Sequence, residues 1–323
     1  MNKYTRGLLF IVLVSVIALS ASARYGALEP ILSARSTAAV FPSPQAQSVP
    51  TLVKNARIQT IQFESKLVGK ILPYNVLLPV GYDQPAARTK RYAVIYLLHG
   101  LSGHYTNWFE KTQLADYAAV YDFIIVTPEG NDGWYTDSAS VASDKYESYV
   151  LQELIPEVEK RFRASSERAG RGIAGLSMGG YGAMKFALKH ADRFAFAASL
   201  SGAFTAASWT EQDLKTPGPI RDSVLQTFGP ANSATRAAND VLKLAREAKP
   251  EALPYLYIDC GTEDFLFNDN REFVTLLLEK KIRHEYRQLP GTHSWKYWDS
   301  QVQEVLRVAA KKLSQPAATA AVN

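Results

Sequence analysis

A serine between glycines is the clearest candidate for nucleophilic chemistry in this chain. Ser177 lies in Gly175-Leu176-Ser177-Met178-Gly179, after a strand-like run over residues 171–174 and before a helix-like run over residues 180–188. A G-x-S-x-G sequence in a strand-to-helix turn is typical of a nucleophile elbow, where small neighbours permit a strained backbone and expose the serine hydroxyl. The alternative is a glycine-rich turn with a solvated serine, because so short a motif also occurs by chance.

A serine nucleophile needs a histidine base held by a carboxylate, and after such an elbow the chain order is Ser, then Asp or Glu, then His. His293 follows the last predicted strand, and Asp264 follows an apolar strand over residues 256–260. Strand ends of this kind meet at the edge of a parallel sheet where catalytic groups gather. Glu263 and Asp259 are the alternative acids, and a surface histidine stacked on a tryptophan is the alternative for His293. The order predicts acyl transfer with Asp264 as the acid.

Acyl transfer also needs two N–H donors for the developing oxyanion. The residue after the nucleophile, Met178, supplies one main-chain N–H. The loop His99-Gly100-Leu101-Ser102-Gly103, directly after an early apolar strand, predicts Leu101 as the second donor. An ordinary glycine-rich turn is the alternative for this loop.

Apolar runs and helical periods alternate along the chain. Two segments at residues 56–64 and 70–79 predict an antiparallel opening pair, and fully apolar runs predict strands buried on both faces. This alternation predicts an α/β fold with a mostly parallel central sheet and helices on both faces. The predicted later strands lie at residues 93–98, 123–126, 194–200, 254–260 and 285–289, and the helices at 146–162, 270–280 and 300–313.

One segment, residues 203–251, interrupts the alternation. It carries Pro217-Gly218-Pro219, a short predicted helix over residues 220–228 and a longer one over residues 234–248. Because it follows a central strand, we expect it at the catalytic edge as a small cap over the pocket. A structural excursion away from the pocket is the alternative.

The amino-terminal residues predict an export signal. Lys3 and Arg6 precede an apolar run over residues 7–19 and the small-residue site Ala21-Ser22-Ala23. We expect a signal peptide at 1–23, a flexible linker at 24–50, a catalytic α/β domain at 51–313 and a disordered tail at 314–323. The mature protein would then be secreted or periplasmic without stable membrane insertion, and an uncleaved anchor is the alternative.

The composition of the chain bears on disulfide bonds, nucleic-acid binding and cofactors. The single cysteine, Cys260, allows no intramolecular disulfide and lies in a predicted buried strand. The net charge of +5 comes from scattered lysines and arginines, which predicts no nucleic-acid partner. No histidine pair has the spacing of a metal site, so we expect neither a metal nor another cofactor. The oligomeric state is left open.

In combination, these motifs resemble the putative esterase family of α/β-hydrolases, which includes S-formylglutathione hydrolase, tributyrin esterase, feruloyl esterases and the antigen 85 mycolyltransferases. The resemblance spans about residues 55–313 and implies a serine carboxylesterase. It carries over Ser177, Asp264 and His293 as the triad, with Leu101 and Met178 as oxyanion donors. The matching stretches are His99 to Gly103 with Asn107-Trp108, Trp134 to Ser138, Tyr146-Glu147, Gly175 to Gly180, Gly261 to Asp264 and His293 to Trp295.

In the same family the stretch beginning at Trp134 and Tyr135 contributes to the pocket wall, which implies a substrate-binding role, with core packing as the alternative. The resemblance and the export signal together predict an exported esterase of short-chain acyl, acetyl or feruloyl esters, small or polysaccharide-linked. The alternatives are an antigen 85-like acyltransferase, an S-formylglutathione hydrolase and a non-catalytic carbohydrate-binding protein on the same scaffold.

Overall fold

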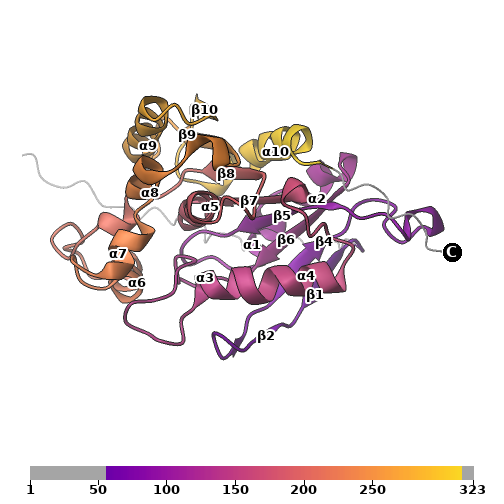
Figure 1. Cartoon of the computed structure of the whole chain (residues 1–323), viewed down its shortest axis with the longest axis horizontal. Helices are drawn as coiled ribbons and strands as arrows, with labels where there is room; N and C mark the ends of the chain where they lie inside the picture. Colours follow the sequence, from indigo (N-terminus) through magenta and orange to yellow (C-terminus); the bar gives the residue numbers. More distant parts are fainter. Residues whose placement is uncertain (1–55, 315–323) are drawn as a thin grey trace, which may run out of the picture. The chain divides into compact units, whose positions relative to one another are not determined.

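The computed structural model describes residues 56–314, and an eight-stranded sheet lies at their centre (Figure 1). The predicted signal peptide and linker, and the tail from residue 315, lie outside the described residues. Strands β5 to β10 run parallel, and β1 and β4 join antiparallel at one edge. The order is β1 (Ile58–Ile61), β4 (Tyr74–Leu77), β6 (Phe123–Pro128), β5 (Ala93–Leu98), β7 (Arg171–Leu176), β8 (Phe196–Leu200), β9 (Tyr255–Gly261) and β10 (His284–Leu289).

Both faces of the sheet are covered, as the continuous apolar strands predict. All six residues of β5 are buried, and they alternate between two hydrophobic clusters: Val94, Tyr96 and Leu98 belong to one and Ala93, Ile95 and Leu97 to the other. The predicted α/β fold is therefore confirmed.

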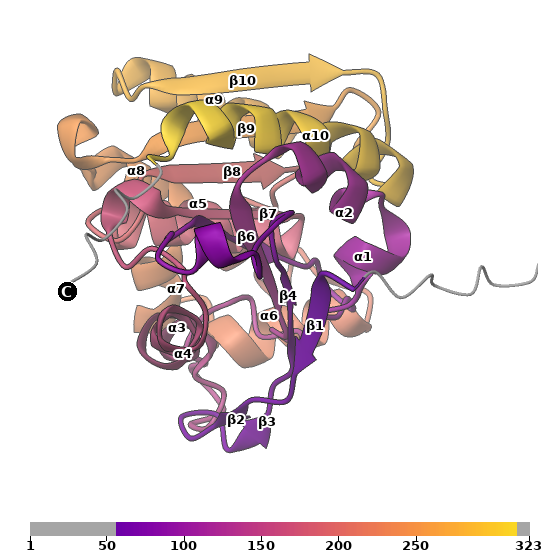
Figure 2. The ribbon, with the colours of Figure 1, turned by 90° about the vertical axis from the view of Figure 1, so that its right-hand side faces the viewer.

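The helices divide between the two clusters. The second cluster is built with α1 (Asn107–Lys111), α2 (Leu114–Tyr117) and α10 (Trp295–Lys312), of which α2 and α10 lie on the near side of the strands in Figure 2. The first is built with α3 (Tyr146–Ser148), α4 (Ile155–Arg161), α5 (Met178–Lys189), α6 (Pro219–Phe228), α8 (Val241–Glu247) and α9 (Phe267–Glu279).

Three elements differ in detail from the expectation. The tip of the opening pair forms its own small ladder, β2 (Glu64–Ser65) with β3 (Lys70–Ile71). The helix predicted over residues 146–162 contains a π-helical segment, Tyr149–Leu154, before Pro156, whose ring nitrogen cannot donate a helical hydrogen bond. The helix predicted over residues 234–248 is two helices, α7 (Ala234–Asn239) and α8, because the Asp240 side chain caps α8.

Cys260 lies in β9 with a free, buried thiol. Burial raises the pKa of this thiol, so the thiolate is disfavoured. In the part of the chain that the structure describes, no helix is long and apolar enough to span a bilayer.

Candidate active site

Ser177 occupies a sharp turn between β7 and α5. Its φ angle of 53° lies in the left-handed region, which is strained for a serine. The turn is held by the Ser177 N–H, which donates to the Leu200 carbonyl at 2.9 Å. A side chain at Gly179 would meet the carbonyl oxygens of Leu98 and His99 at 2.6 Å, so only glycine lets α5 approach β5 this closely.

The structure brings Ser177, His293 and Asp264 into one hydrogen-bonded line. His293 Nε2 lies 3.0 Å from Ser177 Oγ, and His293 Nδ1 lies 2.9 Å from Asp264 Oδ2. Burial works to raise the pKa of the Asp264 carboxyl, but the hydrogen bonds from His293 and the Leu266 N–H, together with the charge interaction with His293, outweigh burial and lower this pKa. The carboxylate is therefore charged at neutral pH and can hold the imidazole with Nε2 facing the serine.

The two alternative acids face other partners. Glu263 is exposed, and its carboxylate accepts hydrogen bonds from the Thr262 hydroxyl and the Gly291 N–H. Asp259 is buried in β9, as its place inside the strand predicts, and accepts from the hydroxyls of Tyr257 and Tyr297. Neither carboxylate has a contact with His293 among the hydrogen bonds and ion pairs of residues 56–314.

Two aromatic rings pack against the imidazole of His293. The Phe265 ring centroid lies 4.6 Å from it, and Trp298 meets it edge-on at 4.8 Å. Trp298 Nε1 donates to Ser201 Oγ at 3.1 Å, and Ser201 is among the groups that lower the pKa of the Asp264 carboxyl. Sequence reasoning missed Phe265 and Ser201. The signal available was position alone, since Phe265 follows Asp264 directly and Ser201 follows β8.

A cavity of about 290 Å³ opens beside the serine. The predicted oxyanion donors flank it: Leu101 is one of its lining residues, and Met178 directly follows Ser177 at the start of α5. Neither main-chain N–H donates to a protein acceptor within the described residues. The cavity is lined by Gly100, Leu101, Ser102, Gly103, Asn107, Leu176, Ser177, His293, Ser294, Trp295 and Trp298.

The predicted role of Trp134 and Tyr135 as substrate-binding residues stays a prediction. Both side chains are buried and neither lines the cavity beside Ser177. Trp134 packs in an aromatic cluster with Tyr181, Trp209 and Phe228. The Tyr135 hydroxyl donates to the His99 carbonyl at 3.1 Å. Core packing, the alternative for this pair, describes their contacts, and Tyr135 supports the loop that carries Leu101.

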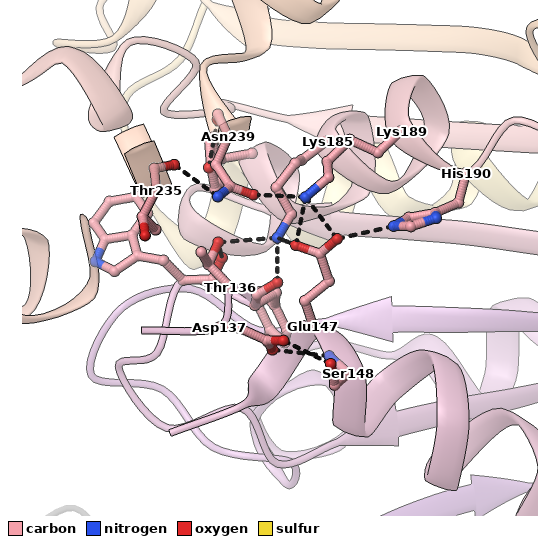
Figure 3. Close-up of polar contacts among 12 residues, drawn as sticks. Thr136, Asp137, Glu147, Ser148, Lys185, Lys189, His190, Thr235 and Asn239 are labelled. Carbon is pink, nitrogen blue, oxygen red and sulfur yellow. Dashed lines mark hydrogen bonds and ion pairs between the residues drawn. The ribbon is translucent and has the colours of Figure 1, made fainter. Parts of the chain in front are cut away.

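A buried ionic network fixes the segment that follows Tyr135 (Figure 3). Lys185 of α5 is fully buried and donates to the Tyr135 carbonyl, to Thr136 Oγ1 at 2.9 Å and to Glu147 at 2.7 Å. Lys189 and His190 also contact Glu147. Burial alone raises the pKa of a carboxyl, yet Lys185, His190 and Lys189 together outweigh burial and hold the pKa of Glu147 well below its usual range. The helix after the serine is thereby tied to the loop after β6.

The insertion at residues 203–251 packs on this same loop. Trp134 Nε1 donates to Ser223 Oγ at 3.1 Å, and the Ala139 N–H donates to the Thr227 carbonyl at 2.8 Å. No residue of the insertion lines the cavity beside Ser177. The expected cap therefore covers the loop after β6 and forms no wall of that cavity. Helix α6 packs against the Trp134 ring through Phe228 and Ser223, away from Ser177.

A hydroxyl, an imidazole and a buried carboxylate in line, with two N–H groups nearby that donate to no described protein acceptor, have the geometry for nucleophilic attack on a carbonyl. Among residues 56–314, no group of three or more His, Cys, Asp or Glu side chains is placed to hold a metal ion.

Comparison with known proteins agrees with this geometry. Residues 65–308 match the family described as Putative esterase. An acetyl esterase from Caldicellulosiruptor saccharolyticus is 28% identical over 255 residues, which are 76% of this chain and 95% of that esterase. An endo-1,4-beta-xylanase/feruloyl esterase from Xylanibacter ruminicola is 28% identical over 180 residues, 52% of this chain and 24% of that protein. The crystal structure of S-formylglutathione hydrolase from Staphylococcus aureus is 28% identical, with a TM-score of 0.69 over 78% of this chain and 98% of that one.

Proposed function

Since the chain belongs to the putative esterase family of serine hydrolases, which act on carboxylic ester bonds, we propose that Ser177 is its nucleophile and that an acyl-enzyme forms on it. The observation that carries the proposal is the 3.0 Å contact between Ser177 Oγ and His293 Nε2, with Asp264 bonded to the other ring nitrogen. A serine in an ordinary surface turn does not have a histidine and a carboxylate aligned with its hydroxyl.

Each group then has one role. Ser177 Oγ attacks the ester carbonyl while His293 Nε2 takes its proton, and the oxyanion binds to the N–H groups of Leu101 and Met178. The alcohol leaves with the proton returned by His293. Water, activated in the same way, attacks the acyl-enzyme and releases the acid. Asp264 keeps its charge throughout and stabilises the imidazolium.

For the substrate we propose an acetyl or feruloyl ester on a polysaccharide. Two similar proteins are named acetyl esterase and endo-1,4-beta-xylanase/feruloyl esterase, which supports this class. The predicted signal peptide supports it too, because an exported enzyme meets polymers and not the cytosolic thioester S-formylglutathione.

A substrate panel tests this choice. We expect the highest kcat/KM with acetylated xylan fragments or methyl ferulate, and a decline along p-nitrophenyl esters of increasing chain length. Highest activity with long acyl chains or with S-formylglutathione would contradict the proposed substrate class. A sugar acceptor added to each assay separates hydrolysis from acyl transfer, since a transferase would form the new ester.

Export has its own test. The Ala21-Ser22-Ala23 sequence places the new amino terminus at Arg24. We expect to find the protein of the native host outside the cytoplasm. Its intact mass should correspond to a chain that begins at Arg24. A full-length product in the cytosol would refute export and favour a glutathione thioester as substrate.

A further inference from the structure

A second cavity, of about 360 Å³, lies between the loop after β6 and helix α6 of the insertion. The loop contributes Asn131 and Asp132, and α6 contributes Asp222 and Gln226. The volume is within the range of small-ligand sites. Neither the catalytic groups nor the family resemblance gives this cavity a role.

One hydrogen bond links the lining of this cavity to the lining of the cavity beside Ser177. The Ser102 N–H donates to Asp132 Oδ1 at 2.6 Å. Ser102 lines the cavity beside Ser177, and Asp132 lines the second cavity. The linings of the two cavities are therefore neighbours at Ser102 and Asp132.

The lining of the second cavity is polar and negatively charged. Asp132, Asp144 and Asp222 contribute three carboxylates, and Lys70 contributes one ammonium, 3.4 Å from Asp144. A formal charge of −2 remains on the lining. Such a site repels anionic ligands. An apolar acyl chain would gain no binding free energy there, because the polar walls would lose their hydration.

Carboxamides complete the lining. Asn131 donates from its side chain to the Tyr146 hydroxyl, and Gln226 donates to Asp144 Oδ2 at 2.9 Å. Each carboxamide carries further donor and acceptor positions, and a carboxylate adds acceptors alone. A mixture of this kind suits a ligand whose hydroxyl groups both donate and accept.

We propose that the second cavity binds the alcohol part of the ester as an uncharged, polyhydroxylated group such as a sugar unit. This inference rests on the proposed function and specifies its substrate. It also gives the insertion a role: α6 supplies half of a substrate-binding site away from the serine. An anionic alcohol or thiol, glutathione included, is disfavoured by the carboxylates.

The test compares two acetyl esters that differ in the alcohol. The measured quantity is the ratio of kcat/KM for an acetylated xylo-oligosaccharide to kcat/KM for p-nitrophenyl acetate. We expect Asp222→Ala and Gln226→Ala each to lower this ratio about tenfold, the effect of one lost hydrogen bond. Gln212→Ala is the matched control, since Gln212 is exposed in the same insertion and does not line the cavity. A ratio within twofold of the wild-type value in both cavity variants would overturn the proposal.

A binding measurement needs no cavity variant. Xylotetraose added to the Ser177→Ala protein is expected to shift the NMR signals of the amides of residues 131–133 and 222–226. Shifts confined to other segments, or none at millimolar sugar, would overturn the proposal. Failure of the proposed function is distinguishable, because wild-type protein would then leave p-nitrophenyl acetate uncleaved.

Discussion

The ring of Phe265 packs against the imidazole of His293 at a centroid distance of 4.6 Å, although 69% of Phe265 is exposed to solvent. Trp298 closes another side of the same imidazole. The two aromatic contacts restrict the ring that must face both Asp264 and Ser177. An exposed phenylalanine contributes little to the free energy of folding. A substitution of Phe265 should therefore act mainly on catalysis, through the lost contact with His293.

Phe265→Ala is expected to lower kcat roughly tenfold to a hundredfold, because a loosened imidazole spends less time aligned with Ser177 Oγ. The midpoint of thermal unfolding should hardly change. Phe265→Tyr keeps the ring and should restore most of kcat, which a general destabilisation would not predict. Wild-type kcat in the alanine variant would show that the contact has no positioning role.

Trp134→Phe distinguishes core packing from substrate binding as the role of Trp134. The variant loses the hydrogen bond to Ser223 and part of the ring volume in the aromatic cluster, so the free energy of unfolding should fall by about 1–3 kcal/mol. Urea denaturation measures this change. KM for p-nitrophenyl acetate should stay unchanged, because Trp134 does not line the cavity beside Ser177. A large rise in KM at unchanged stability would return Trp134 to the pocket wall.

Asp264→Asn keeps the side-chain shape but favours the wrong tautomer of His293, so we expect kcat to fall on the order of 10⁴-fold. Glu263→Gln is the matched control, since Glu263 is the neighbouring carboxylate and contacts Gly291 instead of His293. Its kcat should fall far less. The reverse order in steady-state assays would assign the acid to Glu263.

The local motifs predicted which residues meet. G-x-S-x-G sets the turn at Ser177, and strand ends on one sheet edge bring Asp264 and His293 to it, so these positions follow from sequence order. Contacts between distant loops do not follow from local sequence. The Ser102 to Asp132 bond and the Trp134 to Ser223 bond join segments that are 30 and 89 residues apart, and no periodicity encodes them.

The burial of Trp134 and Tyr135 has a physical cause. Both residues have positive φ angles, near 50°, which turn the chain so that the two rings enter the core. Positive φ angles are uncommon in residues other than glycine, so the local sequence did not predict this conformation. The contacts of Lys185 and Glu147, formed on α5 and α3, help to hold it.

Asp259 predicts a pH dependence of stability. Burial raises the pKa of its carboxyl from the ordinary 3.8 to about 6, although Tyr297 and Tyr257 donate to it. Between about pH 4 and pH 6 the folded protein then binds more protons at this site than the unfolded chain, so this group's contribution to stability falls as the pH rises through that window. The loss amounts to about 3 kcal/mol at neutral pH.

Asp259→Asn removes this titration and keeps the shape of the side chain. Unfolding free energies measured by urea at pH 4, 5, 6 and 7 should therefore fall less steeply in the variant than in the wild type. An identical pH slope in the two proteins would show that Asp259 titrates alike in the folded and unfolded states.

The most direct test of the central claim is kcat of Ser177→Ala with p-nitrophenyl acetate, measured beside circular dichroism of the same sample. Loss of a triad nucleophile costs about 10⁶-fold in kcat, and the fold should persist because the hydroxyl contributes little to packing. We expect no turnover above this residual level, and mass spectrometry of quenched wild-type protein should find the acetyl group on the peptide that contains Ser177. A folded Ser177→Ala protein that keeps more than a few per cent of wild-type kcat would contradict the assignment of Ser177 as the nucleophile.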